Sequence, residues 1–119
     1  MKTRKQSIKS LVKQADKLYQ LKLISDKPVS VVSGKPTEVI HHFIPKSQSN
    51  NLRYDWKNGV PLTHAEHFAH ERKRDPTVLL ACIKKYGEAW HEDLQLRRRF
   101  ICKINKGYLQ DIIKKFSIY

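Results

Sequence analysis

Apolar residues recur at intervals of three and four between residues 5 and 24, and lysines fill much of the opposite face. This spacing places the apolar side chains along one side of a helix, so it predicts an amphipathic helix over residues 5–24. The residues of this apolar face are Ile8, Leu11, Val12, Ala15, Leu18, Tyr19 and Leu23.

The pattern changes after this segment. Residues 26–37 are rich in Pro, Ser, Val and Gly, with alternation in PVSVV and a turn signal in SGKPT. Residues 38–40 and 59–62 each predict a short strand, and together they predict a hairpin. The connection between them, residues 43–58, is longer than most loops inside a small domain, and loops of this length usually serve a function.

Helical patterns occupy the rest of the chain. Thr63 and Glu66 have the spacing of a capping box, which predicts a helix over residues 63–74. Asp75 and Pro76 are suited to end this helix and begin the next one, which Gly87 is expected to stop. Two more helices are predicted, over residues 88–104 and 108–116. The apolar positions expected to face the core in these last three helices are Val78, Leu79, Cys82, Ile83, Tyr86, Trp90, Leu94, Ile101, Leu109, Ile112, Ile113 and Phe116.

These patterns predict a mainly helical α+β fold, and 119 residues fit one domain. Lysine and arginine outnumber acidic residues by 24 to 11, a formal charge of +13 spread over the chain, which favours a nucleic acid partner. A membrane partner is not expected, because the basic residues are not gathered on one amphipathic helix. The N-terminal residues contain no apolar signal-peptide core, so a cytoplasmic location is expected. Cys82 and Cys102 form no C-x-x-C pair and are expected to be buried thiols.

The stretch THAEHFAHE contains three of the six histidines, at every third position. On a helix, residues three or four apart lie on one face, so His67 with His70, or His67 with Glu71, can grip one metal ion. The predicted hairpin brings the pair His41-His42 beside this helix. Adjacent strand residues point to opposite sides, so one histidine of the pair can face the metal while the other faces the substrate.

The order and spacing of His41-His42, Asn58 and His67 resemble those of the HNH nucleases, whose ββα-metal motif is a hairpin with a long loop followed by a helix. On this resemblance the motif covers residues 38–74, between an N-terminal helix and the C-terminal helices of residues 77–116. The resemblance implies that His41 and His67 bind the metal, that His42 is the general base, and that Asn58 ties the loop and orients the base. The third protein ligand stays open between His70 and Glu71.

The segments IKSLVKQADKLYQLKL, SVVSG, HHF, LRYDWKN and VLLACIKKYGEAW are similar in order and spacing to the NinG/Rap recombination nucleases of lambdoid phages. That family has two C-x-x-C pairs, which suggest a structural zinc. Here Ser30 and Ser33 occupy the first pair, and Thr63 and Glu66 the second. This replacement is consistent with a hairpin held by packing and by the capping box. The resemblance implies a nuclease that acts on branched or partly single-stranded DNA in recombination.

The implied chemistry is hydrolysis of a phosphodiester bond with one divalent ion. Mg²⁺ or Mn²⁺ is expected to support activity, and Zn²⁺ or Ni²⁺ to be able to occupy an imidazole-rich site. An imidazole with a reference pKa of about 6.5 can accept a proton from water near neutrality, which suits His42 as the base. The family resemblance implies 3′-hydroxyl and 5′-phosphate products.

The basic residues near the loop and on the helices are candidates for contacts with the DNA backbone, which add affinity but little sequence choice. Trp56 is expected to anchor the long loop to the core. The candidate DNA-binding residues are Arg53, Lys57, Arg72, Lys73, Arg74, Arg97, Arg98 and Arg99.

Two other functions fit the same residues. One is an HNH nuclease of nicking or homing type that cuts ordinary duplex, and the other is a non-catalytic DNA-binding protein with a structural metal. Structural zinc usually has four protein ligands, often including cysteine, whereas this cluster offers three and no cysteine. A symmetric cut of a four-way junction would require two active sites and therefore a homodimer.

Overall fold

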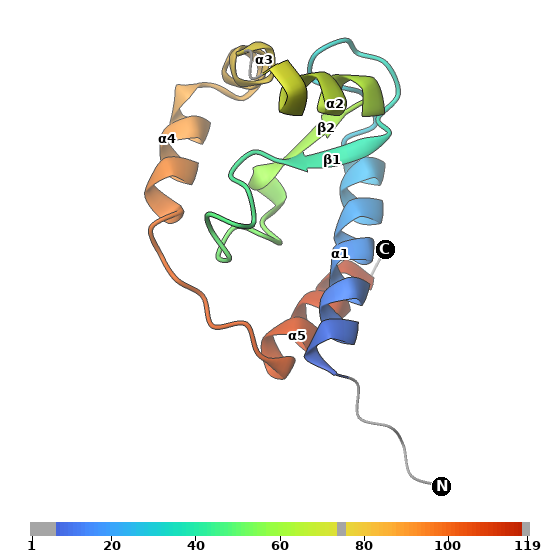
Figure 1. Ribbon diagram of the computed structural model, residues 1–119, viewed down its shortest axis with the longest axis vertical. Coiled ribbons are helices and arrows are strands. Elements are labelled where there is room, and N and C mark those ends of the chain that lie inside the picture. The colour runs from blue at the N-terminus through green and yellow to red at the C-terminus, as the bar shows by residue number, and fades with distance from the viewer. Residues whose placement is uncertain (1–6, 74–75, 118–119) are drawn as a thin grey trace, which may run out of the picture.

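The computed structural model describes residues 7–73 and 76–117, and of Lys73 only the backbone (Figure 1). The predicted fold class is confirmed, because the described chain is mainly helical with one small antiparallel sheet. The predicted cap Asp75 lies outside the described residues. None of the helices in the described ranges is long and apolar enough to cross a membrane. The elements are α1 (Ile8–Asp26), β1 (Val39–His42), the 3-10 helix η1 (Trp56–Asn58), β2 (Gly59–Leu62), α2 (His64–Lys73), α3 (Thr77–Tyr86), α4 (Glu88–Arg97) and α5 (Lys106–Ser117).

Helix α1 is the longest of the described helices, and both α5 and the hairpin pack against it. Its first turn is capped by the hydroxyl of Ser7, which accepts a hydrogen bond from the Ser10 amide at 3.1 Å. The helix ends just before Pro28, since a residue that precedes proline disfavours helical geometry. The N-terminal half of α1 packs beside α5, and the hairpin crosses its C-terminal half, with α2 on the far side of the hairpin (Figure 1).

The two strands pair in the register His42 opposite Gly59 and Ile40 opposite Pro61. Proline has no amide hydrogen, so Pro61 cannot donate a hydrogen bond to Ile40. Both backbone groups of Ile40 bond instead to the side-chain amide of Gln20 on α1, at 2.9 Å for the N–H and 2.8 Å for the carbonyl. Gln20 therefore takes the place of a neighbouring strand and fixes β1 against α1.

Gly59 allows α1 to approach the hairpin directly opposite His42. A Cβ atom at this position would lie 2.1 Å from Leu23 Cδ2 and 2.7 Å from the Tyr19 hydroxyl. We expect Gly59→Ala to lower the free energy of unfolding by about 3 kcal/mol, since overpacking of a tight site costs this order of energy. Thermal unfolding measures the effect, and Gly107→Ala is the matched control because its Cβ would meet nothing closer than 3.5 Å. Equal melting temperatures for the two variants would contradict the close approach.

The capping box at the start of α2 is confirmed. The Thr63 amide donates to Glu66 Oε1 at 2.8 Å, and the Glu66 amide donates to Thr63 Oγ1 at 3.1 Å. Gly87, with φ of 92°, separates α3 from α4 as expected.

The predicted helix over residues 88–104 is wrong beyond Arg97. Asn50 bonds to both backbone groups of Cys102, at 3.2 Å for the N–H and 2.6 Å for the carbonyl, which holds this segment outside a helix. Ile101, expected in the core, is 92% exposed, and Cys102, expected to be buried, is only partly so. The cause is a contact between residues 52 positions apart, which periodicity cannot reveal.

The buried apolar residues form three clusters. The first joins α1, β1 and α5, the second lies between β2 and α3, and the third lies under α4. These clusters are Leu11, Ala15, Tyr19, Leu23, Ile40, Tyr54, Leu109 and Phe116; Val60, Leu62, Val78 and Cys82; and Ile44, Leu52 and Leu94.

Candidate active site

The last two residues of β1 point to opposite sides of the strand, as expected for adjacent strand positions. The ring of His41 lies toward α2, with its centre 5.0 Å from the ring centre of His67 and 4.9 Å from that of His70. The ring of His42 lies toward α1, stacked on Tyr19 with ring centres 5.2 Å apart. The strand therefore gives the two histidines different neighbours.

The three imidazoles of His41, His67 and His70 form a tight cluster, which we call the histidine cluster. Burial, together with the nearby imidazoles of His67 and His70, lowers the pKa of His41 to about 3. His41 is therefore neutral near pH 7, which is the form of imidazole that binds metals.

The side chains of the histidine cluster are of a type that binds divalent ions, because imidazole nitrogen is a common metal ligand. The side-chain Nδ1 of His70 is buried and has no hydrogen-bond partner, which is unusual for a polar atom. Glu71 adds a carboxylate 3.2 Å from His67 Nε2. Among the residues that the structure describes, no group of three or more His, Cys, Asp or Glu side chains is already disposed to hold a metal ion, so the rings would have to turn to take one up.

His42 is held in one tautomer. Its Nε2 lies 2.8 Å from the carbonyl oxygen of Arg53, and because a carbonyl can only accept, Nε2 carries the hydrogen. The lone pair of the neutral ring is then on Nδ1, which has no partner among the described residues. Burial lowers the pKa of His42 and the bond to Arg53 opposes this shift. This arrangement provides an imidazole nitrogen that is free to accept a proton.

Asn58 ties the long loop closed. It is fully buried, its Oδ1 accepts from the Ile44 amide at 2.8 Å, and its Nδ2 donates to the carbonyls of Ile44 and Leu52, both at 3.1 Å. It makes no hydrogen bond to His42. The Leu52 carbonyl that it binds immediately precedes Arg53, whose own carbonyl is the acceptor for His42.

An open cavity of about 330 Å³ lies beside His41, His42 and His67, whereas His70 lines a separate cavity. The open cavity is lined by Gln20, Val39, Ile40, His41, His42, Pro45, Lys46, His67 and Glu71. The sequence did not single out Gln20 or Lys46 as site residues. The position of Lys46 between the histidine pair and Asn58 is a signal that could have found it, whereas no sequence pattern marks Gln20.

The predicted DNA-binding residues have different environments. Arg53 is paired with Asp16, and Arg97 with Asp55 and Asp93. Arg98 donates to the side-chain oxygens of Gln95 and Gln48. Lys57, Arg72 and Arg99 are exposed, whereas Arg74 and the side chain of Lys73 lie outside the described residues.

Trp56 anchors the loop, but to the end of α1 and not to the core. Its ring is 45% exposed, and its indole N–H donates to Asp26 at 2.9 Å. The Lys27 ammonium lies 3.9 Å from the ring centre and donates to the carbonyls of Trp56 at 2.7 Å and Gly59 at 2.6 Å.

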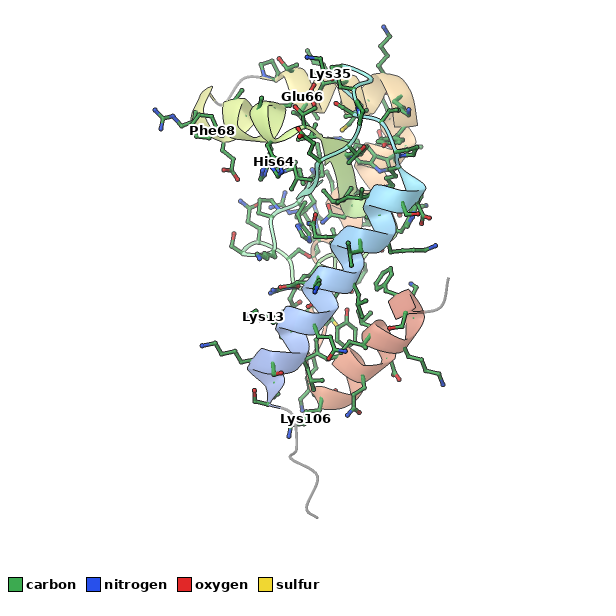
Figure 2. All side chains as sticks on the ribbon, turned by 90° about the vertical axis from the view of Figure 1, so that its right-hand side faces the viewer. Lys13, Lys35, His64, Glu66, Phe68 and Lys106 are labelled. Carbon is green, nitrogen blue, oxygen red and sulfur yellow. The ribbon has the colours of Figure 1, made fainter. Side chains whose placement is uncertain are left out.

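Four polar residues from two distant segments meet above the hairpin, at Ser30, Ser33, Thr63 and Glu66, and we call them the polar knuckle. The Ser30 hydroxyl donates to Glu66 Oε1 at 2.5 Å and accepts from the amides of Val32 and Ser33. Glu66 also bonds to the side chain of Ser33 and to Thr63, and these bonds lower its pKa against the effect of burial. Figure 2 shows Glu66 beside the turn that carries Lys35, while Phe68 projects outward from α2.

Comparison with protein-family models, curated proteins and solved structures finds no match to this chain.

Proposed function

We propose that this chain is a metal-dependent DNA endonuclease in which β1, β2 and α2 act as a ββα-metal motif. The observation that carries the proposal is that His41 and His42 have different environments beside the same cavity. His41 belongs to the histidine cluster, whereas His42 is held by the Arg53 carbonyl and has a free Nδ1. A hydrolytic site needs both a group that stabilises charge on the phosphate and a base that activates water.

His42 is the general base of the proposed reaction. Its Nδ1 takes a proton from a water molecule as the water attacks the phosphodiester phosphorus, and Nε2 keeps its hydrogen bonded to the Arg53 carbonyl. The P–O3′ bond breaks, and the leaving O3′ takes a proton from solvent. The positive charge that develops on the ring is stabilised by that carbonyl. The stacked ring of Tyr19 limits rotation of the imidazole, so the base does not have to be oriented at the moment of reaction.

The proposed metal ligands are His41 and His67, with His70 as the third donor because its buried Nδ1 lacks a partner. Glu71 is the alternative third donor, and its side chain is 63% exposed. When bound, a divalent ion would stabilise negative charge on the phosphate and the leaving oxygen. Two or three imidazoles leave room for substrate oxygen and water on such an ion, which favours catalysis over a closed structural site.

The polar knuckle supports the resemblance to the NinG/Rap recombination nucleases. In that family these positions carry cysteines in two pairs that are far apart in sequence, and here Glu66 of the second pair bonds to Ser30 and Ser33 of the first. Branched or partly single-stranded DNA is therefore the proposed substrate.

The DNA backbone is proposed to approach over Lys46, at the edge of the cavity, and over the exposed face of α1. Lys17 lies one turn from Gln20, a cavity residue, and Lys13 lies one turn further along α1 (Figure 2). None of these three lysines makes an ion pair with a described residue. This surface is more suitable for phosphate than Arg53 or Arg97, whose charges are neutralised by carboxylates.

We expect the double variant Lys17→Gln/Lys46→Gln to bind DNA with a weaker salt dependence. Each phosphate contact contributes about 0.7 to 0.9 to the slope of log affinity against log salt, so the slope should fall by about 1.5. Fluorescence anisotropy over a salt series measures it. The control is Lys84→Gln/Lys85→Gln, which changes two exposed lysines of α3 outside the cavity; an equal fall in both variants would contradict a localised surface.

Cleavage of end-labelled linear duplex, fork, D-loop and four-way junction DNA tests the proposed function, with Mg²⁺, Mn²⁺ or EDTA. The proposal expects metal-dependent cutting with a preference for branched substrates. Equal cutting of linear duplex would favour a nicking or homing-type nuclease. Tight DNA binding without cutting in any metal would overturn the enzyme proposal and favour a DNA-binding protein with a structural metal.

A further inference from the structure

Helix α1 contacts the environment of His42 at two successive turns. Asp16 grips the guanidinium of Arg53 with two hydrogen bonds, from Nε to Oδ1 at 3.0 Å and from Nη2 to Oδ2 at 2.7 Å. The Tyr54 hydroxyl donates to the same carboxylate at 2.9 Å. One carboxylate therefore holds two consecutive side chains of the long loop.

The backbone of Arg53 holds His42. The carbonyl that accepts from His42 Nε2 at 2.8 Å belongs to Arg53, the residue whose side chain Asp16 binds. A two-point guanidinium–carboxylate contact fixes orientation as well as distance, so it limits rotation of the Arg53 peptide. The hydrogen bond of His42 has a fixed acceptor for this reason.

The next turn of α1 holds the ring itself. Tyr19, three residues after Asp16, stacks on His42 with an angle of 21° between the rings. Its hydroxyl donates to the Asp55 carbonyl at 2.8 Å, which pins the loop again two residues beyond Arg53. Helix α1 thus positions both the imidazole of His42 and the Arg53 carbonyl that accepts its hydrogen bond.

We infer that Asp16 is a positioning residue, which acts through the Arg53 carbonyl to keep His42 in the tautomer with hydrogen on Nε2 and the lone pair on Nδ1. The role of Asp16 in DNA cutting rests on the proposed nuclease function, whereas its effect on the tautomer does not. The inference also assigns Arg53 to the support of His42 and not to a phosphate contact. Asp16 stands between Lys13 and Lys17 in a lysine-rich helix, an isolated carboxylate with a specific partner.

Asp16→Asn tests this inference, because asparagine keeps the shape of the side chain but cannot accept both guanidinium bonds. Asp26→Asn is the matched control, since Asp26 also lies on α1 and also accepts from the loop, through Trp56, but does not touch Arg53. Nitrogen-15 and carbon-13 NMR of the His42 side chain in the full chain at pH 8 reports the tautomer directly. We expect a single Nε2–H form in the wild type and the control, and a mixture of both tautomers in Asp16→Asn.

Cleavage kinetics give a second readout. We expect kcat to fall about 10-fold or more in Asp16→Asn with KM for DNA unchanged or lower, because Arg53 is then released as an extra cation, and Asp16→Glu to recover part of the loss. If Asp16→Asn does not fold, Arg53→Lys gives the same readouts, since lysine keeps the charge but loses the two-point grip.

These measurements distinguish failure of the positioning role of Asp16 from failure of the proposed nuclease function. An unchanged tautomer in folded Asp16→Asn would overturn the inference, as would a rise in KM without a fall in kcat. A wild type that shows the Asp16-dependent tautomer but cuts no DNA would support the positioning role and overturn the nuclease function.

Discussion

Replacing His42 with alanine should lower the rate of DNA cutting by about 10²–10⁴-fold, the usual contribution of a general base. The metal should still bind, because the histidine cluster lies on the other side of β1 and does not include His42. Single-turnover cleavage measures the rate, and isothermal titration with Mn²⁺ or Ni²⁺ measures metal uptake. The expected result separates the base from the metal site.

The alanine variant also loses the stacking of His42 on Tyr19, so a fold control is needed. His42→Asn retains a side-chain N–H donor but has no basic nitrogen, and it should be as inactive as His42→Ala. His64→Ala removes an exposed histidine of α2 that does not line the cavity, and it should cut at the wild-type rate. Loss of metal binding in folded His42→Ala would mean that His42 is a ligand, which contradicts its role as the base.

Four cysteines at the polar knuckle should create a zinc site. Glu66 already bonds to Ser30, Ser33 and Thr63, so these four positions lie close together, and four cysteines are the usual ligand set for structural zinc. We expect the quadruple variant Ser30→Cys/Ser33→Cys/Thr63→Cys/Glu66→Cys to bind one additional Zn²⁺. Structural zinc sites in small peptides gain about 10 kcal/mol or more from the metal, so the melting temperature should rise when zinc is added.

The control for the zinc site is the triple variant that keeps Glu66. It should bind zinc more weakly. It should keep the capping bond from the residue 63 amide to Glu66, but it loses the bond from the Glu66 amide to the Thr63 hydroxyl. Cobalt substitution provides a spectroscopic check, because tetrahedral thiolate coordination gives intense visible bands. Absence of zinc uptake by the quadruple variant would show that the four positions do not match a zinc knuckle, and it would remove the support that they give to the recombination-nuclease proposal.

The sequence predicted the elements whose signals are local. The spacing of Leu11, Ala15 and Tyr19 placed α1, and the Thr63 and Glu66 pair placed the start of α2 with both capping bonds. The two short strands were also found, although β1 extends to His42, two residues beyond the predicted end. These features depend on neighbours within a few positions, which is why a pattern can reveal them.

Contacts between distant segments explain what the sequence missed. The bonds between Asn50 and Cys102 hold the segment after Arg97 outside a helix, although Ile101 has the spacing of a core residue. The pairing of Arg53 with Asp16 joins residues 37 positions apart and gives a predicted DNA-binding cation a carboxylate partner. The pattern of charges gives the number of cations but not which of them are already paired.

The sequence was a better guide to which residues lie at the candidate site than to the contacts that these residues make. The separation of His41 from His42 follows from strand geometry, and the structure places their rings on different neighbours as expected. The tautomer of His42 could not be predicted, because it depends on a backbone carbonyl in a loop without period. The same is true of the contacts of Asn58, whose side chain binds the loop and not the imidazole.

In the proposed nuclease, one divalent ion held by the histidine cluster is required for cutting, with His42 as the base. The most direct test is to strip the full chain with EDTA, add Mn²⁺ in steps, and follow metal binding and cleavage of a labelled four-way junction in the same samples. The account predicts no cutting without metal and activity that saturates at one ion per chain. Cutting that survives EDTA, or one bound ion at the histidines without any cutting, would contradict it.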